Sequence, residues 1–104
     1  MYSARDRVEH EAWLEDLQRV TDRLDLDSKA RSCAEDLFLT AVGDVESDRS
    51  KRAVLAASVY AGTRLSGDRR SQVEVADAAG VSRLTVQKRW KDLIERAGLE
   101  PPEW

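Results

Sequence analysis

The chain has 104 residues, enough for one domain with a hydrophobic core of its own and too few for two. Charged residues make up 36% of it, and no apolar run approaches the length that crosses a bilayer, so the sequence predicts neither a membrane span nor a secretory signal. Its single cysteine and single histidine exclude a disulfide framework and a structural zinc site, and we expect no metal and no cofactor.

The charge is distributed unevenly along the chain. The net charge is −3, which taken alone argues against a polyanionic partner. Residues 1–50 carry 7 basic and 13 acidic side chains, whereas residues 51–96 carry 10 basic and 5 acidic ones. The overall sign therefore hides a basic second half, which is where a polyanion would bind.

Apolar residues recur at helical spacing between the glycines, and no period-2 strand pattern is present, so we predict five helices. The first spans about Glu9 to Leu24 and carries an apolar stripe that includes Trp13, Leu17 and Val20. The second follows Asp27-Ser28, either of which can cap it, and Gly43 is placed to end it. Its predicted buried residues are Ala30, Cys33, Ala34, Leu37, Phe38 and Ala41.

The third helix differs from the first two in having no polar face. Residues 44–50 form a polar linker, and the helix then runs from Ser50 or Lys51 to Leu65. Because the stretch after Arg52 is apolar almost all the way round, neighbouring helices must surround it. We therefore predict that it is the central helix of the bundle.

Two shorter segments close the chain. Ser71 and Glu74 have the spacing of a capping box at the start of a helix over Gln72–Ala79. Gly80 permits the left-handed backbone of a tight turn, and Ser82 is placed to cap a fifth helix over Arg83–Ala97 that Gly98 closes. The inward residues of that helix are predicted to be Val86, Trp90, Leu93 and Ala97.

Residues 71–97 therefore have the layout of a helix-turn-helix, the alternative being an ordinary pair of antiparallel helices. In a DNA-binding pair the second helix enters the major groove, where Arg83 would contact guanine, Gln87 adenine and Leu84 a thymine methyl group. Hydroxyl and cationic side chains around them would contact phosphate. The full set of candidate DNA-binding residues is Arg69, Arg70, Gln72, Ser82, Arg83, Leu84, Thr85, Gln87, Lys88, Arg89 and Lys91.

Residues 51–98, and above all the stretch VEVADAAGVSRLTVQKRW at 73–90, resemble the second cyclin-like repeat of archaeal transcription factor B, a relative of transcription factor IIB. The resemblance implies an all-α, five-helix cyclin-like fold over residues 1–104, with a central apolar helix and a C-terminal helix-turn-helix. It further implies that the helix pair reads promoter DNA next to the TATA-binding protein, within the archaeal cytoplasm at the nucleoid.

The sequence also departs from that family. A single cysteine leaves no zinc ribbon, and one repeat stands where the family has two. The valine and arginine with which the family contacts promoter bases correspond here to Leu84 and Gln87. Leucine keeps an apolar contact, whereas glutamine removes a cation. A short regulatory relative therefore fits better than a general initiation factor.

Three classes of function compete. The first is a DNA-binding transcription regulator, in which a homodimer or a DNA-bound TATA-binding protein adds affinity to one helix-turn-helix. The second is a protein-interaction module that binds the TATA-binding protein or another transcription component without reading DNA. The third, an enzyme, lacks a phosphate-binding glycine loop, metal-ligand spacing and a histidine beside a nucleophile, so we predict none.

Overall fold

The computed structural model describes residues 10–96 and 98, and over these residues the chain forms five α-helices, one short 3-10 turn and no strand. The helices are α2 (Glu11–Arg23), α3 (Ser28–Ala41), α4 (Asp48–Ser66), α5 (Gln72–Ala79) and α6 (Arg83–Arg96), and the 3-10 turn is Val42–Asp44. The predicted all-α, five-helix architecture is confirmed. None of the described helices combines the length and the apolar character that a membrane span needs.

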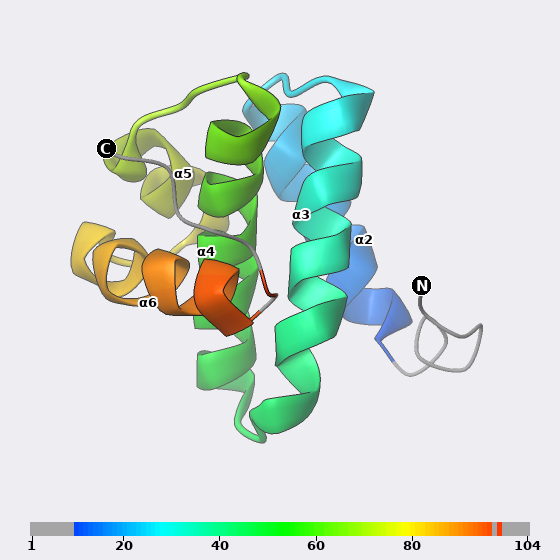
Figure 1. Cartoon of the computed structure of the whole chain (residues 1–104), viewed down its shortest axis with the longest axis vertical. Coiled ribbons are helices and arrows are strands. Elements are labelled where there is room, and N and C mark those ends of the chain that lie inside the picture. Colours follow the sequence, from blue (N-terminus) through cyan, green and yellow to red (C-terminus); the bar gives the residue numbers. More distant parts are fainter. Residues whose placement is uncertain (1–9, 97, 99–104) are drawn as a thin grey trace.

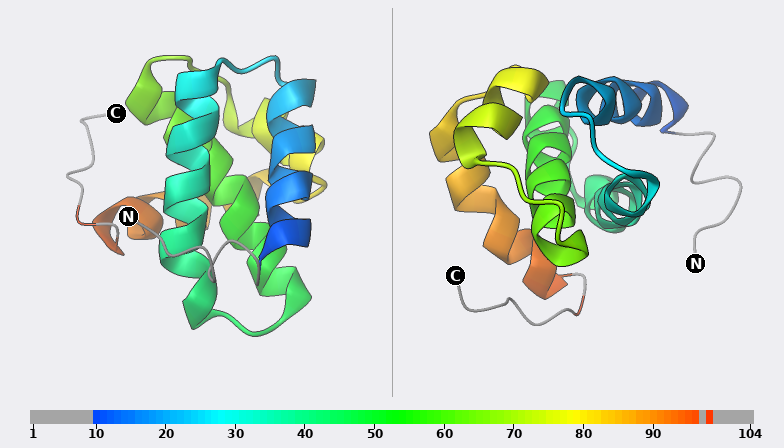
Figure 2. Two further views of the ribbon diagram at one scale, coloured as in Figure 1. Left: turned by 90° about the vertical axis from the view of Figure 1, so that its right-hand side faces the viewer. Right: turned by 90° about the horizontal axis from the view of Figure 1, so that it is seen from above.

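Helix α4 occupies the centre of the bundle. It contacts α2, α3, α5 and α6, and in the view from above it lies between α2 and α3 on one side and α5 and α6 on the other (Figures 1 and 2). Every residue from Ala53 to Thr63 is buried, as expected for a helix with no polar face. The sequence-based prediction of a central apolar helix is confirmed.

Helices α3 and α4 approach each other closely at Gly62. A Cβ atom at that position would lie 3.0 Å from the backbone nitrogen of Ala34 and 3.1 Å from the carbonyl oxygen of Ala30. These contacts are to backbone, which cannot move aside as a flexible side chain can. Glycine is therefore required for the two helix axes to come this near.

The predicted stripes of α2 and α3 are largely the buried faces. Leu17 and Val20 are buried, while Trp13 and Leu24 pack against the core from half-buried positions. On α3 all the predicted residues are buried except Cys33, which is half-buried because it lies at the edge of the stripe. Asp27 caps the start of α3 by accepting a hydrogen bond from the Ala30 amide, 2.8 Å away.

Two boundary predictions were wrong, both in the connection between α3 and α4. Gly43 does not end α3 with a left-handed residue, because the helix stops at Ala41 and Gly43 continues into the 3-10 turn. Helix α4 begins at Asp48, earlier than Ser50 or Lys51, because the Ser47 side chain accepts a hydrogen bond from the Ser50 amide at 3.1 Å. The linker is correspondingly shorter than predicted.

Helix α6 packs one face on α4. The rings of Tyr60 and Trp90 meet edge to face with their centroids 5.3 Å apart. Val86 and Leu93 are buried as predicted, and Ile94 joins them although the sequence interpretation omitted it. Ala97, the fourth predicted inward residue, lies outside the described residues.

Candidate nucleic-acid interface

Helices α5 and α6 are joined by a turn of three residues whose geometry the sequence anticipated. The Ser71 hydroxyl accepts a hydrogen bond from the Glu74 amide, and the Glu74 carboxylate accepts one from the Ser71 amide, both at 3.1 Å. Gly80 is left-handed with φ 74°, and the Val81 amide donates to the Ala76 carbonyl at 3.0 Å. The capping box and the glycine turn are thus confirmed, and they fix where α6 begins.

The start of α6 is capped by Ser82. Its hydroxyl accepts a hydrogen bond from the Thr85 amide at 3.2 Å and also lies 2.9 Å from the Thr85 hydroxyl. At the other end Gly98 has φ 77°, and its amide donates to the Glu95 carbonyl at 3.0 Å. Both predicted ends of the helix are therefore supported by the local hydrogen bonding.

Two arginines from other helices hold the end of α5. Arg23 of α2 donates to the Ala78 carbonyl at 3.0 Å, and Arg52 of α4 donates to the Ala79 carbonyl at 3.3 Å. Cations are favourable at a helix C-terminus because the unpaired carbonyls there carry partial negative charge. This support has no local sequence pattern that would predict it, because the partners are 55 and 27 residues apart in the chain.

Arg52 is itself fixed from a second side. Its guanidinium lies 5.3 Å from the centre of the Trp13 ring and donates to the Asp16 carboxylate at 3.0 Å. The hydrogen bond from Arg19, assisted by the one from Arg52, lowers the pKa of Asp16 in spite of its partial burial. Asp16 is therefore ionised at neutral pH and joins α2 to α4 next to the helix pair.

Most of the eleven candidate DNA-binding residues reach solvent. Eight are exposed: Arg69, Ser82, Arg83, Leu84, Gln87, Lys88, Arg89 and Lys91. Arg70, Gln72 and Thr85 are half-buried.

Three of the candidates meet where α5 and α6 both begin. One guanidinium nitrogen of Arg83 donates a hydrogen bond to the side-chain oxygen of Gln87 at 3.2 Å. The same nitrogen donates a longer one to the side-chain oxygen of Gln72 at 3.4 Å. Gln72 is the first residue of α5, so this contact joins the starts of the two helices. The result is a polar cluster in which one cation is already oriented.

Arg70 lies apart from this cluster. It donates to the Asp68 carboxylate at 2.7 Å and to the Leu24 carbonyl at 3.2 Å, and Asp68 in turn accepts from the Asp27 amide at 3.2 Å. These bonds tie the α4–α5 connection to the α2–α3 connection. Contact of Arg70 with phosphate stays a prediction, and the structure adds an internal bracing role for this side chain.

The outward face of α6 is cationic with one apolar residue. Lys88 and Arg89 make no ion pair with any described residue, and the Lys91 ammonium lies 5.5 Å from the centre of the Trp90 ring. Leu84 is 54% exposed, and Val73 on α5 is 52% exposed. Unpaired cations beside an exposed aliphatic side chain match what base edges and phosphates require.

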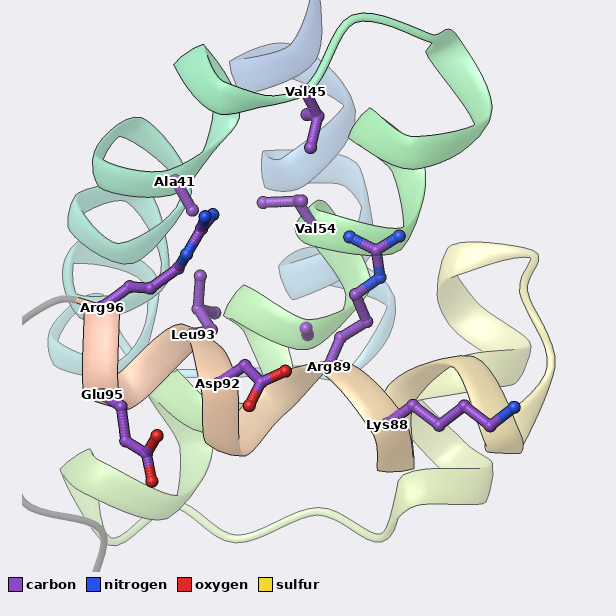
Figure 3. A pocket seen from close by; sticks show the side chains of 10 residues that line it. Ala41, Val45, Val54, Lys88, Arg89, Asp92, Leu93, Glu95 and Arg96 are labelled. Carbon is purple, nitrogen blue, oxygen red and sulfur yellow. The ribbon is translucent and has the colours of Figure 1, made fainter.

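Two hollows flank Lys88 and Arg89. One, of about 620 Å³, lies between α6, the end of α3 and the α4 residues Val54 and Ala57, and there Arg89 and Arg96 extend from α6 toward the other two helices (Figure 3). The other, of about 760 Å³, lies between α2, the start of α4 and the α5–α6 turn. Within residues 10–96 and 98 no three histidine, cysteine or carboxylate side chains gather as a metal site would need.

The fold and this helix pair define an all-α, cyclin-like repeat. Comparison with known proteins identifies the family, because the sequence model of the transcription factor TFIIB repeat matches residues 9–96. The chain belongs to the TFIIB repeat family. The resemblance drawn from residues 51–98 is thereby confirmed and extends through the first two helices, which the sequence alone matched only in length.

Several archaeal proteins are similar to this chain. The chain is 33% identical over 87 residues to transcription initiation factor IIB of Pyrococcus horikoshii and of Pyrococcus abyssi, covering 83% of this chain and 29% of each relative. It is 42% identical over 57 residues to the Archaeoglobus fulgidus protein of the same name, covering 55% of this chain and 18% of the relative. The chain thus spans less than a third of the length of the relatives it matches.

Proposed function

We propose that this protein is a DNA-binding transcription regulator whose α5–α6 pair acts as a helix-turn-helix, with α6 reading duplex DNA. One observation carries the proposal: the exposed face of α6 presents Lys88 and Arg89 with no ion pair to a described residue, beside exposed Leu84. Membership of the TFIIB repeat family supports a role in transcription. The role is one of binding and involves no catalysis.

The roles of the residues follow from their places on the pair. Arg83, Leu84 and Gln87 lie at the start of α6, the part of a recognition helix that meets base edges. The hydrogen bond from Arg83 to Gln87 orients the guanidinium before DNA arrives, which lowers the entropy lost on binding. Lys88 and Lys91 follow one and two turns along the helix, and their ammonium groups would contact phosphate. The side chains left for the flanking phosphates are Arg69, Arg70, Gln72, Ser82, Thr85 and Arg89.

One helix pair makes few phosphate contacts, so a partner would raise the affinity at a promoter. We propose the TATA-binding protein on DNA, or a second copy of this chain, as that partner, and the archaeal cytoplasm at the nucleoid as the place of action. The proposal for the TATA-binding protein rests on the family resemblance. The proposal of a second copy rests on the weak DNA affinity that we expect of a single helix pair.

A second candidate function is a protein-interaction module with the same fold. The observation in its favour is the exposure of Val73 and Leu84, one on each helix of the pair, since exposed aliphatic side chains are common in protein interfaces. On this view the partner is a transcription component, and DNA is not read directly.

The experiment that separates the two uses a duplex selected for binding and a random duplex, each titrated with wild-type protein, Arg83→Ala and Lys91→Ala. We expect Arg83→Ala to weaken binding to the selected duplex by about 1–3 kcal/mol and to relax its specificity. Lys91→Ala should weaken both duplexes alike, because a phosphate contact carries no sequence information. If each variant weakened binding to the selected and the random duplex equally, the assignment of α6 as the reading helix would be wrong. No duplex binding at low salt, with capture of a transcription component, would favour the interaction module.

A further inference from the structure

We propose that DNA is also bound by the start of α4, through the 760 Å³ hollow between α2, α4 and the α5–α6 turn, which we call the α4 groove. Its occupant is the phosphate backbone on the side of α6 that faces away from the start of α5. This inference rests on the proposed function and adds Arg49, which lies outside the helix pair, to the DNA-binding residues.

The charge of the α4 groove favours a polyanion. Arg49, Arg52, Lys88 and Arg89 line it, against a single carboxylate from Asp48. Arg52 is already bonded to Asp16 and to the Ala79 carbonyl, so the cations available to a ligand are the other three. Arg49 is exposed and, like Lys88 and Arg89, makes no ion pair with a described residue.

The neighbouring hollow under the second half of α6 is less suited to phosphate. Lys88, Arg89 and Arg96 line it, but so do Asp92 and Glu95. Figure 3 shows these two carboxylates on the part of α6 that borders the hollow. A phosphate there would meet two negative charges, whereas in the α4 groove it would meet one.

The width of the DNA major groove explains why phosphate contacts are needed on both sides of α6. The major groove is about 12 Å across and a helix with its side chains is about 10–12 Å thick, so both sugar–phosphate backbones lie close to an inserted helix. The start of α5, with Gln72, borders one side of α6. Thr85 and Arg89 are one helical turn apart and both line the α4 groove, so they mark the other side.

Arg89 links the reading helix to the start of α4. Its side chain extends from α6 toward α4 (Figure 3), and Arg89 and Arg49 both line the α4 groove. Helix α4 begins at Asp48, three residues earlier than Lys51, and this extra turn is what brings Arg49 to the groove. A backbone held by Arg89 would therefore pass within reach of Arg49.

The test measures anisotropy of a labelled random-sequence duplex titrated with the full chain across a salt series. Losing one phosphate contact lowers the slope of log affinity against log salt by about 0.9, and we expect this change for Arg49→Gln. The affinity of that variant should fall about two- to fivefold, the range of one exposed ion pair. Asp48→Asn should act in the opposite sense and tighten binding, because it removes the negative charge from the groove.

Lys29→Gln is the matched control. Lys29 is exposed at the start of α3, and Figure 1 shows that this part of α3 and the start of α4 lie at opposite ends of the bundle. The substitution should therefore leave the salt slope unchanged. Thermal unfolding of each variant confirms that the fold is kept. Lys88→Gln tests the proposed function in the same series, since it lies on the reading helix itself.

The outcomes separate the two ideas. Weaker binding by Lys88→Gln with unchanged affinity and slope for Arg49→Gln would overturn the α4 groove and leave the proposed function standing. No duplex binding by the wild-type chain would overturn both. If Arg49→Gln keeps its duplex binding but loses binding to a polyglutamate peptide, the groove takes an acidic protein segment and the inference is wrong.

Discussion

Helices α4 and α6, of 19 and 14 residues, lie against each other, yet they use their surfaces in different ways. Helix α4 is buried against neighbouring helices from Ala53 to Thr63, whereas its start at Asp48 and Arg49 is exposed. Helix α6 buries one face through Val86, Trp90, Leu93 and Ile94 and leaves cations on the other. The middle of α4 therefore serves packing alone, whereas α6 combines a buried face with the residues that we propose to bind DNA.

The difference shows how a small acidic protein can present a basic, exposed helix face. The cations of α6 stand on a helix whose position is set by buried apolar contacts and by Arg23 and Arg52 at the end of α5. The outward residues contribute little to that positioning. Substitutions on the two faces of α6 should thus separate stability from binding.

Trp90→Ala should cause the largest loss of stability. Trp90 is 3% exposed and packs edge to face on Tyr60 of α4, and removing a buried tryptophan side chain costs about 3–5 kcal/mol. Urea unfolding followed by circular dichroism measures the change. Lys91→Ala, at the adjacent exposed position, should stay within about 0.5 kcal/mol of wild type. Similar losses for the two would contradict the division of α6 into two faces.

Gly62→Val should lower the free energy of unfolding by about 2–3 kcal/mol, because the added atoms meet the backbone of Ala30 and Ala34. The control is Gly43→Ala, where a Cβ atom has nothing within 4 Å and the backbone is not left-handed. That variant should differ by about 0.5 kcal/mol at most. A Gly62→Val protein as stable as wild type would show that the α3–α4 contact is looser than described.

Asp25→Gly should raise stability by about 0.5 kcal/mol. Asp25 ends α2 with φ 54°, a left-handed conformation that glycine adopts without steric cost, and the Leu26 amide beyond it donates to the Thr21 carbonyl at 3.0 Å. The midpoint of urea unfolding should move upward, while duplex affinity stays unchanged. A change in affinity would mean that the connections far from α6 control binding, against the comparison made above.

Asp16→Asn tests the smallest effect through its pH dependence. The pKa of Asp16 is lowered in the folded state by Arg19 and Arg52, so its stabilisation is full at neutral pH and is lost as the pH falls through that lowered pKa. Because the pair is partly exposed, we expect Asp16→Asn to cost about 0.5 kcal/mol or less at pH 7, and to cost less than that once the pH falls below the ordinary range of a carboxyl group, as at about pH 2. An equal loss at both pH values would mean that the effect is one of packing.

The helices that could be predicted from the sequence are those whose signals are local. Ser71, Glu74 and Gly80 set the ends of α5 within a few residues of themselves, and the apolar run after Arg52 identified the central helix. The start of α4 was missed because the Ser47 cap lies inside a polar stretch that has no apolar periodicity to mark it. The prediction that Gly43 ends α3 was wrong because α3 passes into a 3-10 turn, which needs no left-handed residue.

At the candidate site, the sequence predicts which residues are exposed on α6, but it does not predict the contacts that hold the helix pair in place. The helical spacing of the apolar residues in α6 predicts which positions face outward, so Arg83 and Lys88 could be named as exposed cations from the sequence. The support that Arg23 and Arg52 give to α5, and the meeting of Arg49 with Arg89 in one hollow, depend on residues far apart in the chain. Only the packing of the helices brings such residues together, and a single sequence does not encode it as a pattern.

The central claim is that the outward face of α6 binds duplex DNA without contributing to stability. The direct test is Lys88→Glu, with duplex anisotropy over a salt series and urea unfolding measured on the same preparation. We predict that log affinity of the wild type falls linearly with log salt, that the variant loses binding, and that its free energy of unfolding stays within about 0.5 kcal/mol of wild type. Wild-type-like binding by Lys88→Glu would contradict the claim.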